Sequence, residues 1–296
     1  MAAPGGGSGL EGSLSVTWNP NRNNTPSSHG LIALDGGMAK RPMGKVWLVG
    51  AGPGDPELMT RKAERLIQCA DVILHDCLIG EAILAMAPPA AMRMNVGKRK
   101  GGPSVAQEQI NRLLIALARR GLQIVRLKGG DPFIFGRGGE ELLACRHEGV
   151  PCEVVPGVSA ALAAAAGAGA PLTHRGVAQS VTFVTGQSSA QSAELDLDWT
   201  ALARPNHTLA VYMGLSAAPE IASRLLAEGR SPSTPVLLVS RASLPRERRA
   251  QTTLGDLARV APALEGPVVL LIGETAALAD AVDRQAANTP LRRIEA

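Results

Sequence analysis

The sequence predicts an α/β fold of two α/β domains, with mostly parallel sheets and a ligand-binding cleft between them. From Gly44 onward, short apolar runs alternate with helical stretches, which is typical of a parallel sheet covered by helices. A Gly/Ala/Pro-rich segment at 167–171 interrupts the pattern and indicates a hinge. A cleft between two such halves is a natural ligand site. We therefore expect an N-terminal domain over 44–157 and a C-terminal domain over 158–290.

The first half predicts four strands separated by helices. Thr60 is expected to cap the first helix, and Ser104 with Gln107 forms a capping-box pattern before a second helix that Gly121 ends. A third helix is expected over 139–148, and an alanine-rich helix follows Pro156 and Gly157. The expected strands are 46–49, 72–75, 123–127 and 153–155.

The second half continues the alternation with four more apolar runs. A helix with apolar residues at helical spacing is closed by Gly229, and a shorter helical piece is expected over 254–260. The expected strands are 180–184, 208–213, 236–240 and 268–272. The two ends of the chain lack this pattern: residues 1–43, rich in Gly, Ser, Asn and Pro, predict a disordered leader, and 291–296 a short tail.

The composition favours a globular protein with a mild basic bias. The chain has 296 residues, 45% of them hydrophobic, which suffices for one large or two ordinary cores. The net charge of +4 suits an anionic ligand but does not demand nucleic acid, and 2% aromatic residues argue against base stacking. The longest apolar stretch, 160–172, is shorter than the about 20 residues of a membrane helix. We expect neither nucleic-acid nor membrane partners.

The cysteines predict reduced thiols in a cytoplasmic protein. The four cysteines form no CxxC pair and no zinc-ligand spacing with histidine, and the first residues lack the basic start and apolar run of a secretory signal. His147 shares an expected helix with Cys145, but further ligands are missing from its surroundings in the sequence. We expect no metal.

The most informative stretch follows the expected strand 123–127. Gly129 and Gly130 let a ligand approach the backbone, and Pro132 prevents the strand from continuing. Ligands collect beyond the carboxyl ends of strands in open α/β sheets. Asp131 is therefore a candidate contact for a hydroxyl or cationic group.

The segment 50–56, GAGPGDP, has part of a dinucleotide-binding fingerprint. Asp55 stands in the place of the third glycine, and Pro53 and Pro56 remove amide donors that a pyrophosphate needs. A tight turn against an uncharged part of a ligand is the favoured interpretation. Asp76, about 20 residues on, lies where a ribose-binding acid is expected, which keeps the nucleotide alternative open.

Seven motifs, in order along the chain, resemble the uroporphyrinogen-III C-methyltransferases of the tetrapyrrole methylase family. GDPFIFGRGGEE is the discriminating part, because other members of the same fold usually vary it after Gly-Asp-Pro. The motifs are GAGPGDP at 50–56, VGKR at 96–99, SVAQEQIN at 104–111, VRLKGGDPFIFGRGGEE at 125–141, VVPGVSA at 154–160, PLTHRG at 171–176 and VYMGL at 211–215.

The resemblance implies a homodimeric methyltransferase with the tetrapyrrole methylase fold. Such enzymes use S-adenosyl-L-methionine to methylate uroporphyrinogen III at C2 and C7, giving precorrin-2 for sirohaem or cobalamin biosynthesis. A methylase of a later precorrin and a non-catalytic tetrapyrrole- or cofactor-binding protein are the alternatives. By position, the implied cofactor contacts are Pro53, Gly129, Gly130, Asp131, Ile134, Ser159, Ala160, Met213 and Ala242.

The resemblance also implies catalytic and substrate-binding residues. Asp76 corresponds to the family's proton acceptor and Lys98 to its proton donor; a helix cap and a solvated basic run are the structural alternatives. Because the substrate carries eight carboxylates, cations within the motifs are candidate contacts. The substrate-binding candidates are Arg99, Lys128, Arg137 and Arg175, with Lys98, Lys100 and Arg126 as further cations.

Three departures from the family pattern bear on the site. Cys77 stands where an arginine is common, and Gln187 replaces a usual histidine. Ala242 replaces a usual glycine and can serve if its φ is negative. Two further residues have open roles: His174 is expected to bond a turn rather than a propionate, and Tyr212 either lines the cofactor pocket or packs in the core.

Overall fold

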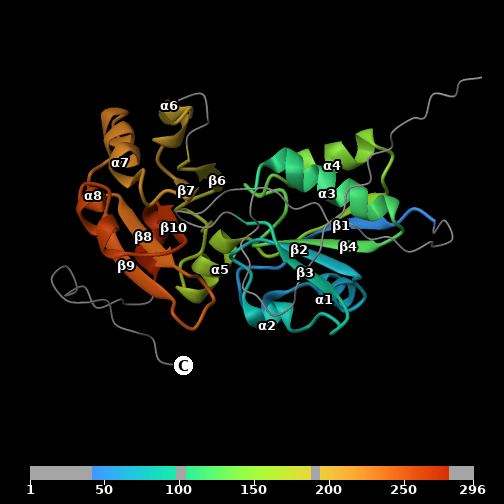
Figure 1. Cartoon of the computed structure of the whole chain (residues 1–296). Coiled ribbons are helices and arrows are strands. Elements are labelled where there is room, and N and C mark those ends of the chain that lie inside the picture. The colour runs from blue at the N-terminus through green and yellow to red at the C-terminus, as the bar shows by residue number, and fades with distance from the viewer. Residues whose placement is uncertain (1–41, 98–104, 188–193, 280–296) are drawn as a thin grey trace, which may run out of the picture. The chain divides into compact units, whose positions relative to one another are not determined.

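The computed structural model describes residues 42–97, 105–187 and 194–279, which contain two five-stranded sheets with flanking helices (Figure 1). The first sheet has the strand order β3-β2-β4-β1-β5, and all of its pairings are parallel. Its strands are β1 (Lys45–Gly50), β2 (Val72–His75), β3 (Met92–Asn95), β4 (Gln123–Lys128) and β5 (Cys152–Val155). The four strands expected in this half are confirmed, and β3 is an additional edge strand.

The second sheet is mixed, with the strand order β6-β7-β10-β8-β9. Only β6 and β7 pair in parallel; the other three pairings are antiparallel. Its strands are β6 (Ser180–Thr185), β7 (His207–Tyr212), β8 (Pro235–Ser240), β9 (Arg248–Thr253) and β10 (Val268–Ile272). The expectation of a mostly parallel sheet is therefore wrong here, because β10 lies between β7 and β8 and runs antiparallel to both. Strand β9, with the polar sequence RRAQTT, adds a third antiparallel pairing as a hairpin with β8 and was not predicted from the sequence.

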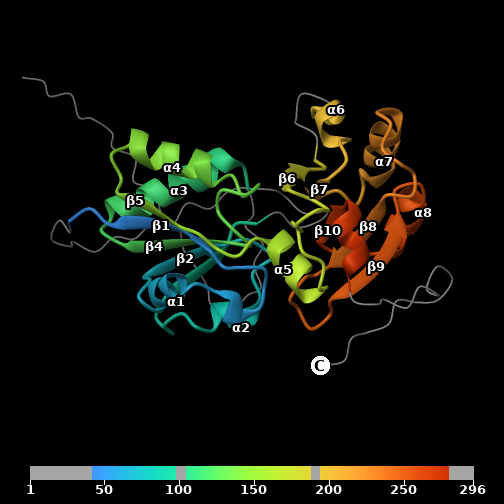
Figure 2. The ribbon, with the colours of Figure 1, turned by 180° about the vertical axis from the view of Figure 1, so that it is seen from behind.

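Helices cover both faces of the first sheet, with α3 and α4 on one face and α1 and α2 on the other (Figures 1 and 2). The α-helices are α1 (Arg61–Gln68), α2 (Glu81–Leu84), α3 (Gln107–Arg119), α4 (Gly138–His147), α5 (Ala160–Gly167), α6 (Trp199–Leu202), α7 (Ala218–Ala227) and α8 (Leu257–Val260). Short 3-10 helices cover Pro56–Leu58, Ala261–Ala263 and Glu274–Leu278. None of the described helices has the length and apolarity that crossing a membrane requires.

The two helix starts that the sequence marked have different outcomes. Thr60 caps α1 as expected, since its Oγ1 accepts a hydrogen bond from the Ala63 N–H at 3.2 Å. The capping box is wrong: α3 begins at Gln107, so this residue cannot be the third residue of a helix capped by Ser104, which itself lies outside the described residues. Instead the Gln109 side chain accepts from the Ala106 N–H.

Alternating side chains of each sheet enter two separate cores. In β1, Val46 and Leu48 pack toward α3 and α4, whereas Val49 packs toward α1 and α2. In the second sheet, one face packs against α7 and α8, and the other packs against the alanines of α5. A central parallel strand buried on both faces explains why β1 and β4 read as continuous apolar runs.

The described residues from Pro42 to Ala279 group in one compact unit, so the division at 157/158 stays a prediction. The alanine-rich helix α5 belongs with the second half, because Ala161 and Ala164 pack with Leu237 and Leu271 of the second sheet. The predicted leader is described only at Pro42 and Met43, and the predicted tail lies outside the described residues.

Candidate cofactor and substrate site

Three glycines bring the carboxyl ends of β1, β4 and β5 into backbone contact. A Cβ added at Gly50 would lie 2.6 Å from both the Gly130 carbonyl oxygen and the Gly157 nitrogen. Gly52 and Gly130 exchange two backbone hydrogen bonds of 3.2 and 2.7 Å. Gly130 has a φ of +67°, which glycine adopts without strain. The 50–56 turn and the loop after β4 are therefore held together by backbone hydrogen bonds and close backbone packing.

Asp131 fastens the same loops with its carboxylate. Its Oδ1 accepts from the Phe133 N–H at 2.8 Å, and its Oδ2 accepts from the Gly157 N–H at 3.0 Å. Each carboxylate oxygen keeps one further acceptor site. At Gly129, in contrast to Gly130, an added Cβ would meet only the Leu78 Cβ, at 3.7 Å, so the backbone there is open to a ligand. The predicted contacts Pro53 and Ile134 are both half-buried.

Tyr212 connects the end of β7 to the start of α5. Its hydroxyl lies 2.6 Å from the Oγ of buried Ser159 and accepts from the Ala161 N–H at 3.1 Å. Its ring packs against Phe135 and Phe183, with centroids 5.1 and 5.8 Å away. Burial raises the pKa of Tyr212, so the hydroxyl stays protonated. Tyr212 is therefore half-buried against the alanine-rich core around α5 and also orders the segment that holds the predicted contacts Ser159 and Ala160.

The predicted contacts of the second sheet lie at one edge. Strands β7 and β8 run in the same direction because β10 lies between them antiparallel to both, so Met213 after β7 and Ala242 after β8 share an edge. Met213 is 46% exposed, and Ala242 is buried. Arg241 and Ser243 have left-handed φ values of 53° and 66°, whereas Ala242 is not among the positive-φ residues. The expected condition for alanine at this position, a φ that is not positive, is therefore met.

Asp76 follows β2 directly and pairs with an arginine from β4. Arg126 Nη2 lies 2.5 Å from Asp76 Oδ1; the arginine side chain is 3% exposed and the aspartate side chain 28%. Although Cys77 stands where the family pattern has an arginine, Arg126 supplies a positive charge next to Asp76. The Asp76 carboxylate is thus partly exposed while one of its oxygens is held by Arg126.

Lys128 is buried and engaged in an ion pair. Its Nζ lies 3.1 and 3.0 Å from the two carboxylate oxygens of Glu141, on α4. Burial, with the neighbouring charge of Arg126, lowers the pKa of Lys128 against the opposing effect of Glu141. A contact between Lys128 and a substrate carboxylate, as the sequence predicts, requires the ammonium to leave this pair.

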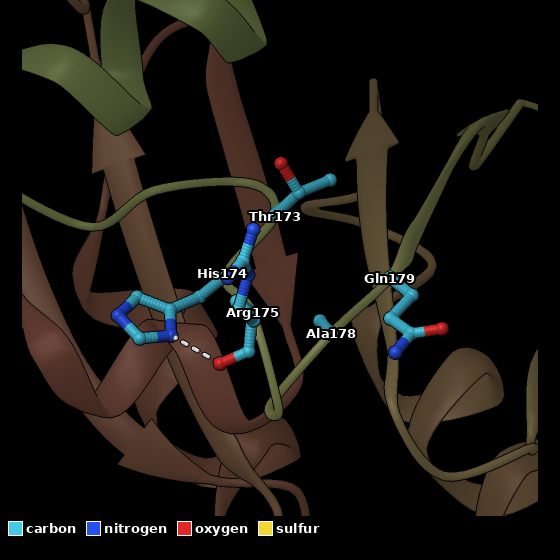
Figure 3. A pocket seen from close by; sticks show the side chains of 5 residues that line it. All are labelled: Thr173, His174, Arg175, Ala178 and Gln179. Carbon is cyan, nitrogen blue, oxygen red and sulfur yellow. Dashed lines mark hydrogen bonds between the residues drawn. The ribbon is translucent and has the colours of Figure 1, made fainter.

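The two other described cations of the predicted substrate site are exposed. Arg137 donates two hydrogen bonds of 2.7 Å to Glu140, which raises the pKa of Arg137. Arg175 lines a pocket of about 340 Å³ with Thr173, Ala178 and Gln179 (Figure 3). In that pocket His174 Nδ1 lies 2.9 Å from the Arg175 carbonyl, a contact within the turn as expected. The candidates Lys98, Arg99 and Lys100 lie outside the described residues.

A family model described as Tetrapyrrole (Corrin/Porphyrin) Methylases matches residues 45–258. The chain belongs to the tetrapyrrole methylase family. The uroporphyrinogen-III C-methyltransferase of Paracoccus denitrificans is 50% identical over 243 residues, which cover 81% of this chain and 84% of the relative. The siroheme synthase 1 of Yersinia enterocolitica is also 50% identical over 243 residues, but the chain spans only 51% of its length.

Solved structures of tetrapyrrole methylases share the fold. The uroporphyrin-III C-methyl transferase from Thermus thermophilus, complexed with S-adenyl homocysteine, has a TM-score of 0.70 and 45% sequence identity. The match covers 79% of this chain and 100% of that one. The recognition of the family from its motifs and the expected α/β fold are thus confirmed, apart from the strand directions in the second sheet.

In this tetrapyrrole methylase, the residues at the edges of both sheets fit a sulfonium nucleoside. Such a ligand has no phosphate, so open backbone at Gly129, the Asp131 carboxylate and apolar side chains are suitable partners. Exposed apolar residues follow the strands that carry these loops: Leu78, Phe133, Phe135 and Met213. Among the described residues, no group of three or more His, Cys, Asp or Glu side chains could hold a metal ion.

Sequence reasoning missed two residues of this methylase site. The sequence showed Glu141 only as part of the GRGGEE motif. A carboxylate on the buried face of a helix, with two cations on the preceding strand, is a signal that predicts an ion pair. Ser243 was missed because its role depends on a distant segment: its Oγ accepts from the Asp55 N–H at 3.2 Å.

Proposed function

We propose that the chain is an S-adenosyl-L-methionine-dependent uroporphyrinogen-III C-methyltransferase that converts uroporphyrinogen III to precorrin-2 by methylation at C2 and C7. The observation that carries this proposal is the 50% identity with the Paracoccus methyltransferase over 84% of that protein's length. The Thermus structure with S-adenyl homocysteine supports the choice of cofactor. The geometry supports the same proposal, since the motif loops form one joined feature at the edge of the first sheet.

We assign the cofactor to the nine predicted contacts at these edges. When bound, S-adenosylmethionine supplies an electrophilic methyl group on a cationic sulfur. Asp131 accepts from amino or hydroxyl groups with its remaining lone pairs, and the open backbone at Gly129 lies against the nucleoside. Apolar side chains such as Met213 exclude water, which strengthens the effect of the fixed dipoles on the dispersing charge.

Positioning accounts for most of the proposed catalysis. A pyrrole carbon of a porphyrinogen is an enamine-like nucleophile and needs orientation more than activation, with the reacting atoms about 3 to 3.5 Å apart. After the methyl group has bonded to this carbon, a ring proton must leave. Asp76 is the proposed acceptor, because its carboxylate is partly exposed while Arg126 holds one of its oxygens. Lys98 is the proposed proton donor.

The carboxylates of the macrocycle require cations at the surface. Arg137 and Arg175 are exposed and are the described residues that best suit this role, whereas Lys128 needs to leave Glu141 first. Arg99 completes the proposed set. The mild basic bias of the chain adds a long-range attraction for such a polyanion.

The proposal extends to assembly and location. We infer a homodimer in the cytoplasm, whose product enters sirohaem or cobalamin biosynthesis. None of the four cysteines, all within the described residues, forms a disulfide bond, which supports a reducing compartment. Sedimentation of the purified chain measures the assembly, and a monomer at micromolar concentration would contradict it.

An anaerobic assay tests the function. The purified chain is incubated with uroporphyrinogen III and methyl-labelled S-adenosylmethionine, and we expect two labelled methyl groups per macrocycle and the mass of precorrin-2. A parallel reaction with a later precorrin tests the first alternative. Calorimetric binding of the cofactor without turnover on either macrocycle identifies a non-catalytic binding protein. Absence of label on uroporphyrinogen III rejects the proposal.

A further inference from the structure

Four charged side chains form a connected network between β4, α4 and the end of β2. Glu141, 0% exposed, accepts from Arg126 Nε at 3.0 Å and from Lys128 Nζ at 3.0 and 3.1 Å. Gln107, on α3, adds a hydrogen bond of 3.1 Å to the same carboxylate. Arg126 then reaches Asp76 at 2.5 Å. The order of contacts is therefore Lys128, Glu141, Arg126, Asp76.

Burying this network carries a large desolvation cost. Burying ions costs several kcal/mol each, and well-packed apolar residues of similar size often stabilise a protein equally well. The two cations and two anions balance, and only the last member, Asp76, reaches the surface, with 28% of its side chain exposed. Stability alone does not account for a buried charge network that ends at the proposed proton acceptor.

The Arg126 guanidinium is held in place by Glu141 and in turn fixes the orientation of the Asp76 carboxylate. Its Nε donates to Glu141, its Nη1 donates to the Leu127 carbonyl at 3.2 Å, and its Nη2 donates to Asp76. Because the guanidinium is planar and rigid, fixing Nε also fixes the direction of Nη2. Burial lowers the pKa of Arg126, but the charges of Asp76 and Glu141 outweigh this and raise it, so the arginine remains charged.

We infer that Glu141 is a positioning residue for methyl transfer: through Arg126 it holds the carboxylate of Asp76 in the direction needed to accept the ring proton. The inference rests on the proposed function. Without the charge of Glu141, Arg126 and Lys128 become two adjacent cations that have lost their common carboxylate partner, so Arg126 no longer holds Asp76 in the same direction.

The first test is Glu141→Gln, assayed with uroporphyrinogen III. We expect kcat to fall at least about tenfold, while KM for both substrates and the affinity for S-adenosylhomocysteine stay within about twofold. Glu148→Gln is the matched control, because Glu148 ends the same helix and pairs with exposed Arg119 at 2.5 Å but has no contact with the network. Its kcat should change less than about twofold. An unchanged kcat in Glu141→Gln overturns the inference.

The second test asks whether Glu141 acts through Asp76. If it does, adding Glu141→Gln to Asp76→Asn should lower kcat by no more than about twofold beyond Asp76→Asn alone. Two losses that multiply would assign Glu141 a separate, structural role and overturn the inference.

Arg126→Lys keeps the test decisive if Glu141→Gln does not fold. Lysine retains the charge but cannot bridge Glu141 and Asp76 as the planar fork does, so we expect the same loss of kcat and the same lack of additivity with Asp76→Asn. Thermal melting and S-adenosylhomocysteine binding confirm that each variant is folded. A wild-type chain without activity rejects the proposed function, whereas an active wild type with an equally active Arg126→Lys rejects only the role of the network.

Discussion

The two sheets reach a similar functional edge by different topologies. In the first sheet all five strands are parallel, so every carboxyl end lies at the same edge. In the second, β9 and β10 run against their neighbours. Strands β6, β7 and β8 nevertheless share one direction, and the loops after β7 and β8 carry Met213 and Ala242. A site of this kind requires that the strands carrying its loops run in the same direction. It does not require that the whole sheet be parallel.

The sheets also differ in how the proposed contacts are made. At the first sheet, side chains and glycines act together: Asp131 binds the backbone of Gly157, which lies against Gly130. At the second, the loop after β8 places left-handed residues on both sides of Ala242. We therefore expect substitutions at the first edge to affect stability and cofactor binding more strongly.

The largest effect is expected for Gly157→Ala. The new Cβ would overlap the Gly130 carbonyl oxygen and lie 2.9 Å from Gly50 Cα, so the free energy of unfolding should fall by about 3 kcal/mol. Gly139→Ala in α4 is the control, because nothing lies within 4 Å of its Cβ position, and it should be neutral or slightly stabilising. Urea denaturation measures both. Equal effects would show that the glycine contacts do not hold this edge together.

The next effect is on cofactor binding. Asp131→Ala removes two backbone hydrogen bonds and the proposed carboxylate contact, so the affinity for S-adenosylhomocysteine should fall at least about tenfold. Asp76→Asn should leave this affinity unchanged and slow product formation. Calorimetry compares the two variants with wild type. Equal affinity for wild type and Asp131→Ala would remove Asp131 from the site.

A smaller effect tests the connection from the second sheet to α5. Tyr212→Phe keeps the ring contacts but removes the hydroxyl that bonds Ser159 and Ala161, and should lower the free energy of unfolding by about 1 kcal/mol. Ser159→Ala removes one end of the same hydrogen bond. Thermal unfolding of the double variant should be less affected than the sum of the single variants; additive losses would mean that the two hydroxyls act independently.

The smallest effect concerns the exposed ion pairs of β5. Hydrogen bonds from Lys45 and Lys62 lower the pKa of Glu153 to about 2, from an ordinary value near 4.5. Because the folded-state pKa is the lower one, this stabilisation is present above about pH 4.5 and is lost as the pH falls toward 2. The pairs are exposed, so we expect less than about 1 kcal/mol, measured as the difference in acid dependence between wild type and Glu153→Gln. High salt should shrink this difference, and an identical acid dependence would contradict it.

Local sequence signals predicted four of the five strands in each half and missed β3 in the first and β9 in the second. Thr60 predicted the start of α1, because a side-chain cap acts within three residues. Apolar runs predicted β1, β2 and β4, because those strands are buried on both faces. Strand β9 gave no such signal, since its polar side chains are only partly buried. The start of α3 was misplaced because Gln107, read as half of a cap, packs inward and bonds Glu141.

The sequence by itself determined the family and the positions of the motif loops, because these depend on residue types at fixed spacing, and the resemblance to the family implied the cofactor. Only the tertiary structure decided which cations are buried and which are exposed: Arg126 and Lys128 belong to the Glu141 network, whereas Arg137 and Arg175 lie at the surface. The physical reason is that the packing of β4 against α4 brings the charged partners together. Glu141 lies 13 positions from Lys128 and 15 positions from Arg126 along the chain, so neighbouring residues in the sequence do not reveal these pairs.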